Sequence, residues 1–299
     1  MKTILASLAF FIGLTAAQAQ EETPQTQQDT TKAWKAKGNF SLLINQSSFS
    51  NWASGGENNI SGTVGVNYDF NYKKDDISWD NKLIASYGLV KTNNSSFEKK
   101  TDDRFEFNSL LGKKIGTGKW YYSAFLNFKT QFTDGYIYSR NAAGAEERTK
   151  NSGFMSPGYL TFGPGILWKE NDNLKFNFAP VSSKFTFVDK AFTSVPGYED
   201  GAYFGVDQGK SMRYELGFYA SGYYKLDVLA NVTFENILSL YSNYLEEPQN
   251  VDMDYQLNIL MKINRYLSSN ITFQAIYDDN AYRGFQIRQV VGLGVNFNF

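Results

Sequence analysis

The chain of 299 residues contains neither cysteine nor histidine. Without cysteine it cannot form a disulfide, use a thiolate nucleophile or build a zinc–thiolate site. Without histidine it lacks the imidazole that normally activates a serine or a water molecule at neutral pH. Serine–histidine and histidine–carboxylate hydrolase mechanisms are therefore excluded. We predict that the protein has no catalytic residues, no cofactor and no enzymatic activity.

An excess of charge of either sign is also missing, because 29 basic residues balance 30 acidic ones. That balance favours neither nucleic-acid binding nor an electrostatic trap for acidic substrates. Beyond the N-terminus, no stretch approaches the roughly 18 consecutive apolar residues that a membrane helix needs. Yet 17% of the residues are aromatic and the mean hydropathy is −0.40. This combination is typical of a membrane β-barrel, in which apolar and polar residues alternate between aromatic girdles.

The N-terminus has the features of a secretory signal peptide over residues 1–19. Lys2 supplies the positive charge, an apolar run follows, and Ala17-Gln18-Ala19 forms an A-x-A cleavage site. We expect Sec-dependent export with cleavage near Ala19. A membrane anchor is the weaker alternative because the apolar run is too short to span a bilayer. The Gln/Thr-rich residues 20–35 are expected to form a disordered periplasmic segment, which leaves residues 36–299 for the folded domain.

The last fifteen residues, FQIRQVVGLGVNFNF, alternate between an apolar face and a polar, glycine-rich face. Successive side chains of a strand point to opposite faces, so this segment is predicted to be a half-apolar β-strand. The closing Phe-x-Phe resembles the terminal strand by which outer-membrane β-barrels are closed. We therefore assign barrel closure to Phe297 and Phe299.

Eleven further segments from Gly38 onward alternate in the same way, which predicts twelve strands, an even number as in bacterial single-chain barrels. Short turns at 73–76, 116–119, 170–173, 224–226 and 264–267 alternate with longer connections at 51–59, 90–103, 133–156, 188–211, 241–249 and 278–284. A soluble β-sandwich does not require that regularity. We predict a transmembrane antiparallel β-barrel in the Gram-negative outer membrane, with both termini periplasmic. Outer-membrane lipid and the barrel-assembly machinery are then its expected partners.

Several stretches resemble a family of Bacteroidetes outer-membrane proteins that is named as a domain of unknown function. They are FSNWASGGENN (49–59), GVNYDFNYKKDD (65–76), SLYSNYLEEPQNVDMDY (239–255), MKINRYLSSN (261–270), IYDDN (276–280) and GLGVNFNF (292–299). The resemblance extends from about Trp34 to Phe299. It implies a single outer-membrane barrel and no assigned activity, so no catalytic residue is carried over.

The predicted interior carries nearly balanced charges scattered over different strands. The interior acidic residues are Asp69, Asp80, Glu106, Glu215, Asp227, Glu235, Asp252 and Asp254, and the basic ones are Lys82, Lys129, Lys175, Arg213, Lys262 and Arg288. A basic track would suit acidic sugars and an acidic ring would suit cations, and neither is present. Two hypotheses remain: ion pairs that satisfy one another, favoured here, or a selective substrate path. Either is expected to include water, because buried ion pairs are costly without hydrogen bonds.

Two loop segments contain candidate ligand contacts. Trp52, beside Glu57 and Asn58, can stack on a sugar ring, although a tryptophan of the aromatic girdle is the more ordinary explanation. Asp278 and Asp279, together with Asp252 or Asp254, offer oxygen ligands for Ca²⁺. Their spacing matches no EF-hand loop, and a solvated turn is the favoured interpretation.

Pro164 and Pro180 are unusual because proline cannot donate a hydrogen bond to a strand ladder. A hairpin turn at 170–173 places them nearly opposite each other. The apolar phase also changes from even at Phe178 to odd at Phe185, which predicts a β-bulge between residues 179 and 184. The bulge is either structural or a lateral weak point for an apolar ligand.

Two functions remain open. The first is a narrow channel or small-solute transporter, favoured by a polar interior with small residues at Gly163, Gly165, Gly292 and Gly294. The second is a non-conducting accessory or structural barrel that binds another outer-membrane protein or component, favoured by the balanced interior charge.

Overall fold

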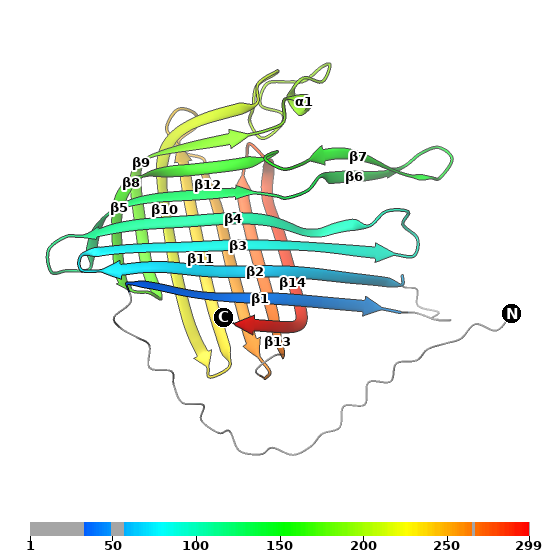
Figure 1. Ribbon diagram of the computed structural model, residues 1–299. Coiled ribbons are helices and arrows are strands. Elements are labelled where there is room, and N and C mark those ends of the chain that lie inside the picture. The colour runs from blue at the N-terminus through cyan, green and yellow to red at the C-terminus, as the bar shows by residue number, and fades with distance from the viewer. Residues whose placement is uncertain (1–32, 49–56, 265–266, 299) are drawn as a thin grey trace, which may run out of the picture. The chain divides into compact units, whose positions relative to one another are not determined.

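The computed structural model describes residues 33–48, 57–264 and 267–298. In these residues twelve antiparallel strands close into a barrel in the order β1-β14-β13-β12-β11-β10-β9-β8-β5-β4-β3-β2 (Figure 1), which confirms the predicted fold class. The barrel strands are β1 (Trp34–Ser47), β2 (Asn59–Lys74), β3 (Ile77–Thr92), β4 (Lys99–Lys114), β5 (Trp120–Thr130), β8 (Gly158–Asn171), β9 (Leu174–Phe187), β10 (Met212–Leu229), β11 (Val232–Asn243), β12 (Val251–Lys262), β13 (Leu267–Asp278) and β14 (Tyr282–Asn298). Within the described residues no helix is long and apolar enough to cross a membrane.

The connections alternate between the two ends of the barrel as the sequence predicted. Short connections lie at one end, together with Trp34 and Asn298; we call this the turn end. Longer connections lie at the other end, which we call the loop end. β1 begins two residues before the predicted start of the barrel at residue 36. The predicted 90–103 loop is much shorter than expected, because β3 continues to Thr92 and β4 begins at Lys99.

Two of the predicted loops contain secondary structure of their own. The 133–156 segment forms a hairpin of β6 (Gly135–Arg140) and β7 (Glu146–Ser152), which projects from the loop end in Figure 1. The 188–211 segment contains the short helix α1 (Lys190–Thr193), whose N-cap Asp189 accepts a hydrogen bond from the backbone of Ala191. The sequence did not predict the hairpin because β7, EERTKNS, has no apolar face.

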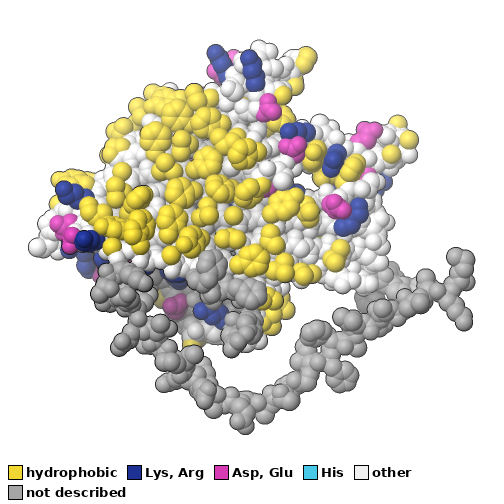
Figure 2. Space-filling model, in the orientation of Figure 1, with side chains coloured by type: hydrophobic (Ala, Val, Ile, Leu, Met, Phe, Trp, Pro, Cys, Tyr) yellow, Lys and Arg dark blue, Asp and Glu magenta, His cyan; other side chains and the backbone are white. Residues whose placement is uncertain are grey.

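The outer surface of the barrel is apolar between two charged ends. Figure 2 shows a hydrophobic band across the visible face, with Lys, Arg, Asp and Glu gathered beyond it. At the turn end, the Trp34 ring lies 5.2 Å from the Tyr72 ring and 5.7 Å from the Trp79 ring, between ring centroids. Exposed outward side chains in the middle of the strands include Leu42, Val64, Phe162, Ile166, Phe178, Val291 and Leu293. The alternation that predicted the strands therefore separates an apolar outside from a polar inside.

Candidate functional site: the barrel interior and its seams

Charged side chains cross the interior and join strands that are not neighbours in the barrel. Lys82 Nζ on β3 lies 2.7 Å from Glu235 Oε1 on β11. Lys129 Nζ on β5 lies 2.5 Å from Asp254 Oδ2 on β12. These partners come from opposite walls, so the pairs bridge the interior space. Ion pairs that satisfy one another, the first of the two hypotheses for the interior charges, describe this half of the barrel.

Further pairs continue this arrangement toward both ends. Near the turn end, Asp80 lies 3.0 Å from Lys169 Nζ and 2.6 Å from Lys175 Nζ. Nearer the loop end, Arg288 of β14 reaches Asp102 of β4 at 2.5 Å. Arg104 also forms an ion pair with Glu106 and donates a hydrogen bond to Gln256 on β12. The predicted interior residues Lys82, Glu106, Lys129, Arg213, Glu215, Glu235 and Arg288 all take part in these or the loop-end contacts.

The sequence analysis missed several interior cations, among them Arg104, Lys169 and Lys184. Lys184 follows the bulge in β9, so the phase of the apolar residues before the bulge places it on the wrong face. Lys169 alternates with Trp168 and shares its face with Gly163 and Gly165, a signal that was available. Arg104 alternates with Phe105 in the same way, beside a segment that was assigned to a loop.

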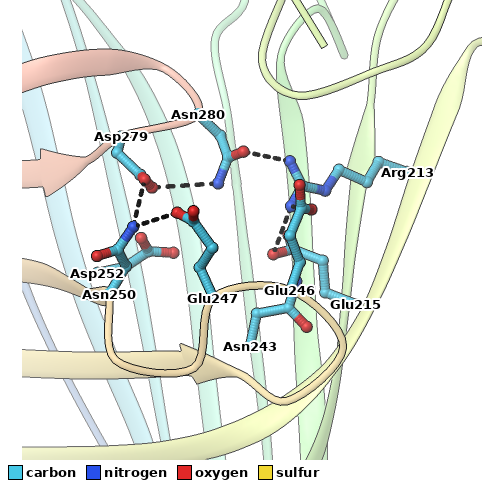
Figure 3. A pocket seen from close by; sticks show the side chains of 9 residues that line it. All are labelled: Arg213, Glu215, Asn243, Glu246, Glu247, Asn250, Asp252, Asp279 and Asn280. Atoms are coloured by element: carbon cyan, nitrogen blue, oxygen red, sulfur yellow. Dashed lines mark hydrogen bonds and ion pairs between the residues drawn. The ribbon is translucent and has the colours of Figure 1, made fainter. Parts of the chain in front are cut away.

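A small polar cavity of about 40 Å³ lies at the loop end. It is lined by Arg213, Glu215, Asn243, Glu246, Glu247, Asn250, Asp252, Asp279 and Asn280 (Figure 3). Arg213 contacts Glu246 at 2.8 Å and Glu215 at 3.4 Å, so carboxylates from a strand and a loop converge on one guanidinium. The cavity is therefore held together by ion pairs and by hydrogen bonds of Asn250 and Asn280 among its own lining residues.

The carboxylates suggested for Ca²⁺ do come together: oxygens of Asp252, Asp278 and Asp279 lie within 4.8 Å of one another. Lys184 Nζ already lies 2.7 Å from Asp252 and 3.7 Å from Asp278. Asp279 accepts a hydrogen bond of 2.8 Å from the Asn250 side chain. Three carboxylates supply only part of the six to eight oxygens that Ca²⁺ takes, and a lysine neutralises two of them. Calcium binding was the less favoured alternative to a solvated turn, and these contacts do not test it.

An apolar cluster fills one side of the interior. The Phe125 and Tyr219 rings stack with centroids 4.2 Å apart and planes 9° apart, and Ala179, Tyr241 and the partly buried Leu110 pack beside them. These side chains come from β4, β5, β9, β10 and β11. The wall formed by those strands is consequently closed by packed side chains as well as by ion pairs.

The opposite wall, formed by β13, β14, β1 and β2, is lined mainly by uncharged polar and small residues. Its inward-facing side chains include Ser41, Asn45, Thr63, Asn67, Ser268, Asn270, Thr272, Gln274, Gln286 and Val290, with glycines at 65, 292 and 294. Lys37 and Asp69, also inward, pair with each other at 3.8 Å. Asn67, in the middle of β2, is exposed although it points inward, and so are Asn45 and Gln286. Solvent therefore reaches these three positions, whereas Ser268 and Gln274 on β13 of the same wall are buried.

The loop residues proposed as ligand contacts have structural partners. Glu57 accepts a hydrogen bond of 3.1 Å from the Asn94 backbone, and the Asn58 carbonyl accepts one from the Asn93 backbone. Both residues tie the chain before β2 to the β3–β4 loop. Trp52 lies outside the described residues, so neither the favoured aromatic-girdle position nor the alternative sugar contact is tested.

The seam between β8 and β9 is irregular where the prolines stand. Its register changes between Phe162↔Ser183 and Ile166↔Phe178, so that β9 has one residue more than β8 in that interval. The β9–β10 register also shifts, across Pro180 and Val181. This is the interval in which the sequence predicted a bulge. A Cβ on Gly163 would lie 2.6 Å from the Val181 carbonyl oxygen, so the two backbones approach closely and the seam is shut.

The seam between β1 and β14 is paired over only part of its length. Within the described residues, partners run from Asn39↔Asn298 to Leu43↔Gly294, including Phe40↔Phe297. β1 pairs with β2 from Trp34↔Tyr72 to Ser47↔Asn59, so β1 itself is a complete strand. In Figure 1, β14 runs across the direction of β1 and bends near its C-terminal end to lie alongside it. The sequence assigned closure to Phe297 and Phe299, of which Phe299 lies outside the described residues.

Residues 44–136 match the model of a family described as protein of unknown function (DUF3078). That match contains the stretches quoted above from 65–76 and 49–59, whereas the resemblances noted from 239 onward lie beyond it. The Bacteroidetes origin stays a prediction. No curated protein matches the chain.

Among solved structures, the COG4313 outer membrane channel from Pseudomonas putida F1 is 8% identical, with a TM-score of 0.38, over 88% of this chain and 95% of that one. The translocator domain of the autotransporter NalP from Neisseria meningitidis is 8% identical, with a TM-score of 0.35, over 91% and 90%. The P. putida toluene transporter TodX is 12% identical, with a TM-score of 0.31, over 89% and 78%. The barrel architecture of the present chain rests on its own strand pairing.

Proposed function

We propose that the protein is a narrow outer-membrane channel for small, uncharged polar solutes. The passage follows the wall of β13, β14, β1 and β2. The observation that carries this proposal is the exposure of Asn67, which points inward from the middle of β2. A filled interior would bury that side chain, as it buries Asn127 and Asn177 on the opposite side.

The membrane location is supported by the surface of the barrel. An apolar outer band bounded by aromatic rings suits a strand wall in a bilayer, and the polar interior suits water. The short turns and both ends of the described barrel lie together, and short turns are periplasmic in such proteins. The turn end is therefore assigned to the periplasm and the loop end to the outside.

The selectivity of the passage follows from its charges. Most of the cross-interior pairs lie on β3–β5 and β8–β12, and Arg288 on β14 is neutralised by Asp102, so the passage has neither a basic track nor an acidic ring. Amide and hydroxyl side chains are left to contact the solute. Size should decide entry, with little discrimination between cations and anions.

Purified protein in planar bilayers tests the channel. We expect small stepwise conductance with nearly equal permeability to K⁺ and Cl⁻. Asn67→Trp should lower the conductance several-fold, because the indole occupies the exposed part of the interior. Val66→Trp is the matched control, since the neighbouring side chain points outward, and it should conduct like the unmodified protein.

If the unmodified protein gave no conductance steps over many insertions, the channel would be contradicted and the accessory barrel favoured instead. Conductance that Asn67→Trp leaves unchanged would contradict the assigned path.

A further inference from the structure

We propose that the β1–β14 seam is a lateral portal between the passage and the surrounding hydrocarbon. It would admit an amphipathic molecule with an uncharged polar head and one apolar chain. The inference deepens the proposed channel function, on which it rests, by assigning a second substrate class to the same passage. Its evidence is the pairing, polarity and exposure of the two strands.

The pairing of the two strands defines the opening. Beyond Leu43↔Gly294 toward the loop end, residues 44–48 and residues 289–293 of β14, which the same register would place opposite one another, have no partner across the seam. Residues 282–288 of β14 would face 49–55, which lie outside the described residues. β14 remains paired with β13 over both intervals, from Ile271↔Val291 to Tyr277↔Phe285. The opening is therefore a single free edge beside an intact strand.

The backbone groups on this unpaired strand edge need hydrogen-bond partners. Each unpaired backbone N–H or C=O in hydrocarbon costs several kcal/mol, because lipid chains offer no hydrogen bond. Outward side chains of this part of β14, such as Val291 and Leu293, are apolar and belong to the membrane-facing surface. The edge must be satisfied by water or by the polar groups of a ligand, and the exposed inward Gln286 supplies continuity with the passage.

The two sides of the opening differ in polarity, and this difference selects the ligand class. Outside, Ile44, Val291 and Leu293 are 60%, 55% and 51% exposed, so an apolar chain finds apolar neighbours. Inside, Asn45 and Gln286 offer hydrogen bonds. Arg288 is the inward-facing charge on this part of β14, and Asp102 already neutralises it at 2.5 Å. An uncharged head is consequently favoured over an ionic one.

Two glycines set the lower limit of the portal. A Cβ on Gly292 would lie 2.6 Å from Leu43 Cδ1, and one on Gly294 would meet the Leu42 carbonyl oxygen. Without side chains at these positions, β1 can close tightly over β14 and the paired interval begins. The portal therefore opens only toward the loop end, in the outer leaflet of the proposed orientation.

Because the natural chain contains no cysteine, single cysteines can be labelled specifically. A fluorophore is attached to Val290→Cys, which faces inward beside the opening, in vesicles of phosphatidylcholine. The probe is an alkyl maltoside with a nitroxide on its chain. Leu293→Cys, facing lipid, is the positive control, and Ser221→Cys, facing inward on β10, is the negative control. Gln286→Cys is a second inward position should the first variant fold poorly.

We expect strong quenching at Leu293→Cys, comparable quenching at Val290→Cys and almost none at Ser221→Cys. Quenching at the two seam positions, 290 and 286, as weak as at Ser221→Cys would overturn the portal. In native outer membranes, the cysteine at position 290 could be protected from a maleimide and lose that protection on purification. This result would show that a protein strand occupies the seam, and it would also contradict the proposal that an amphiphile binds there. Quenching needs no ion flow, so conductance without quenching contradicts the portal alone, and quenching without conductance contradicts the channel alone.

Discussion

The β8–β9 and β1–β14 seams are both irregular, yet one is closed and the other is open. In the first, two prolines and a bulge interrupt the ladder, but glycines bring the backbones together. The apolar cluster around Phe125 and Ala179 packs directly behind that interval. In the second, β14 contains no proline, and the strands separate because β14 bends away from β1.

The difference shows that local chain chemistry and barrel closure are separate sources of irregularity. A missing proline donor affects one rung and can be compensated by the neighbouring backbone. Two strands that diverge lose every rung beyond the point of divergence, and only water, ligand or another strand can replace those bonds. The proline seam is therefore the weaker candidate for lateral access, although the sequence pointed to it.

The largest expected effect comes from removing the short paired part of the open seam. Deleting Phe297–Phe299 removes the pairs Phe40↔Phe297 and Asn39↔Asn298, and the remaining partners then end at Ser41↔Asn296. An unclosed barrel exposes backbone groups to hydrocarbon at several kcal/mol each. We expect a severe loss of outer-membrane protein and degradation in the periplasm, measured by quantitative blotting of membrane fractions. Asn298→Ser keeps the backbone and should assemble normally; normal assembly of the deletion would refute the closing role.

The next effect concerns the ion pairs that fill the closed side. Glu235→Ala leaves Lys82 with Asp69 at 3.7 Å as its remaining ion-pair partner, and it removes the acceptor for the Tyr223 hydroxyl. Removing one member of a buried pair leaves the other charge buried without its partner. We therefore expect the free energy of unfolding in detergent to fall by about 3 kcal/mol. Glu170→Ala, whose partner Lys119 is 54% exposed, is the control and should change stability by less than about 1 kcal/mol. Equal effects would mean that the interior pairs are fully hydrated.

Much of this barrel can be predicted from the sequence because strand alternation is local. The twelve strands, the alternating connections and the bulge near Pro180 all follow from side-chain period and turn residues. The divergence of β1 from β14 could not be predicted, since both strands keep a regular alternation and the missing bonds depend on how the whole sheet curves. The ion-pair partners of Lys82 and Lys129 could not be predicted either, because pairing across the interior depends on which strands face each other in the closed barrel.

A smaller effect is expected from forcing the closed seam apart. The Cβ of Gly163→Ala would lie 2.6 Å from the Val181 carbonyl oxygen and 2.9 Å from Ser182 Cα, and backbone atoms cannot move aside cheaply. Overpacking of this kind costs about 1–3 kcal/mol, which denaturant unfolding in micelles can measure. Gly62→Ala is the matched control on β2, where a Cβ would meet only the Leu43 carbonyl oxygen at 3.9 Å. An unaffected Gly163→Ala protein would mean that the seam is loose and would restore it as a lateral access route.

The smallest effect tests whether the closed seam depends on the β6–β7 hairpin, which belongs to the connection leading into β8. Glu146 on β7 accepts hydrogen bonds of 2.8 Å from the Ser95 hydroxyl and the Ser96 backbone, and its carboxylate lies 2.8 Å from Lys99 Nζ. The hydrogen bond from Lys99 and those from Ser95 and Ser96 lower the pKa of Glu146 to about 2, from 4.5 for a free glutamate. A lowered pKa means that the anchoring is complete above about pH 4.5 and is lost as the pH falls toward 2.

Hydrogen exchange of the Ser96 and β7 amides should therefore accelerate over that pH interval, while the β8 and β9 amides keep their protection. Glu146→Gln removes the charge at every pH and should show the faster exchange already at pH 7. Glu147→Gln is the control, because Glu147 bonds to Asn141 inside the hairpin rather than to the barrel. Loss of protection in β8 together with β7 would show that the hairpin holds the seam shut, and closure by the backbone contact at Gly163 alone would then be wrong.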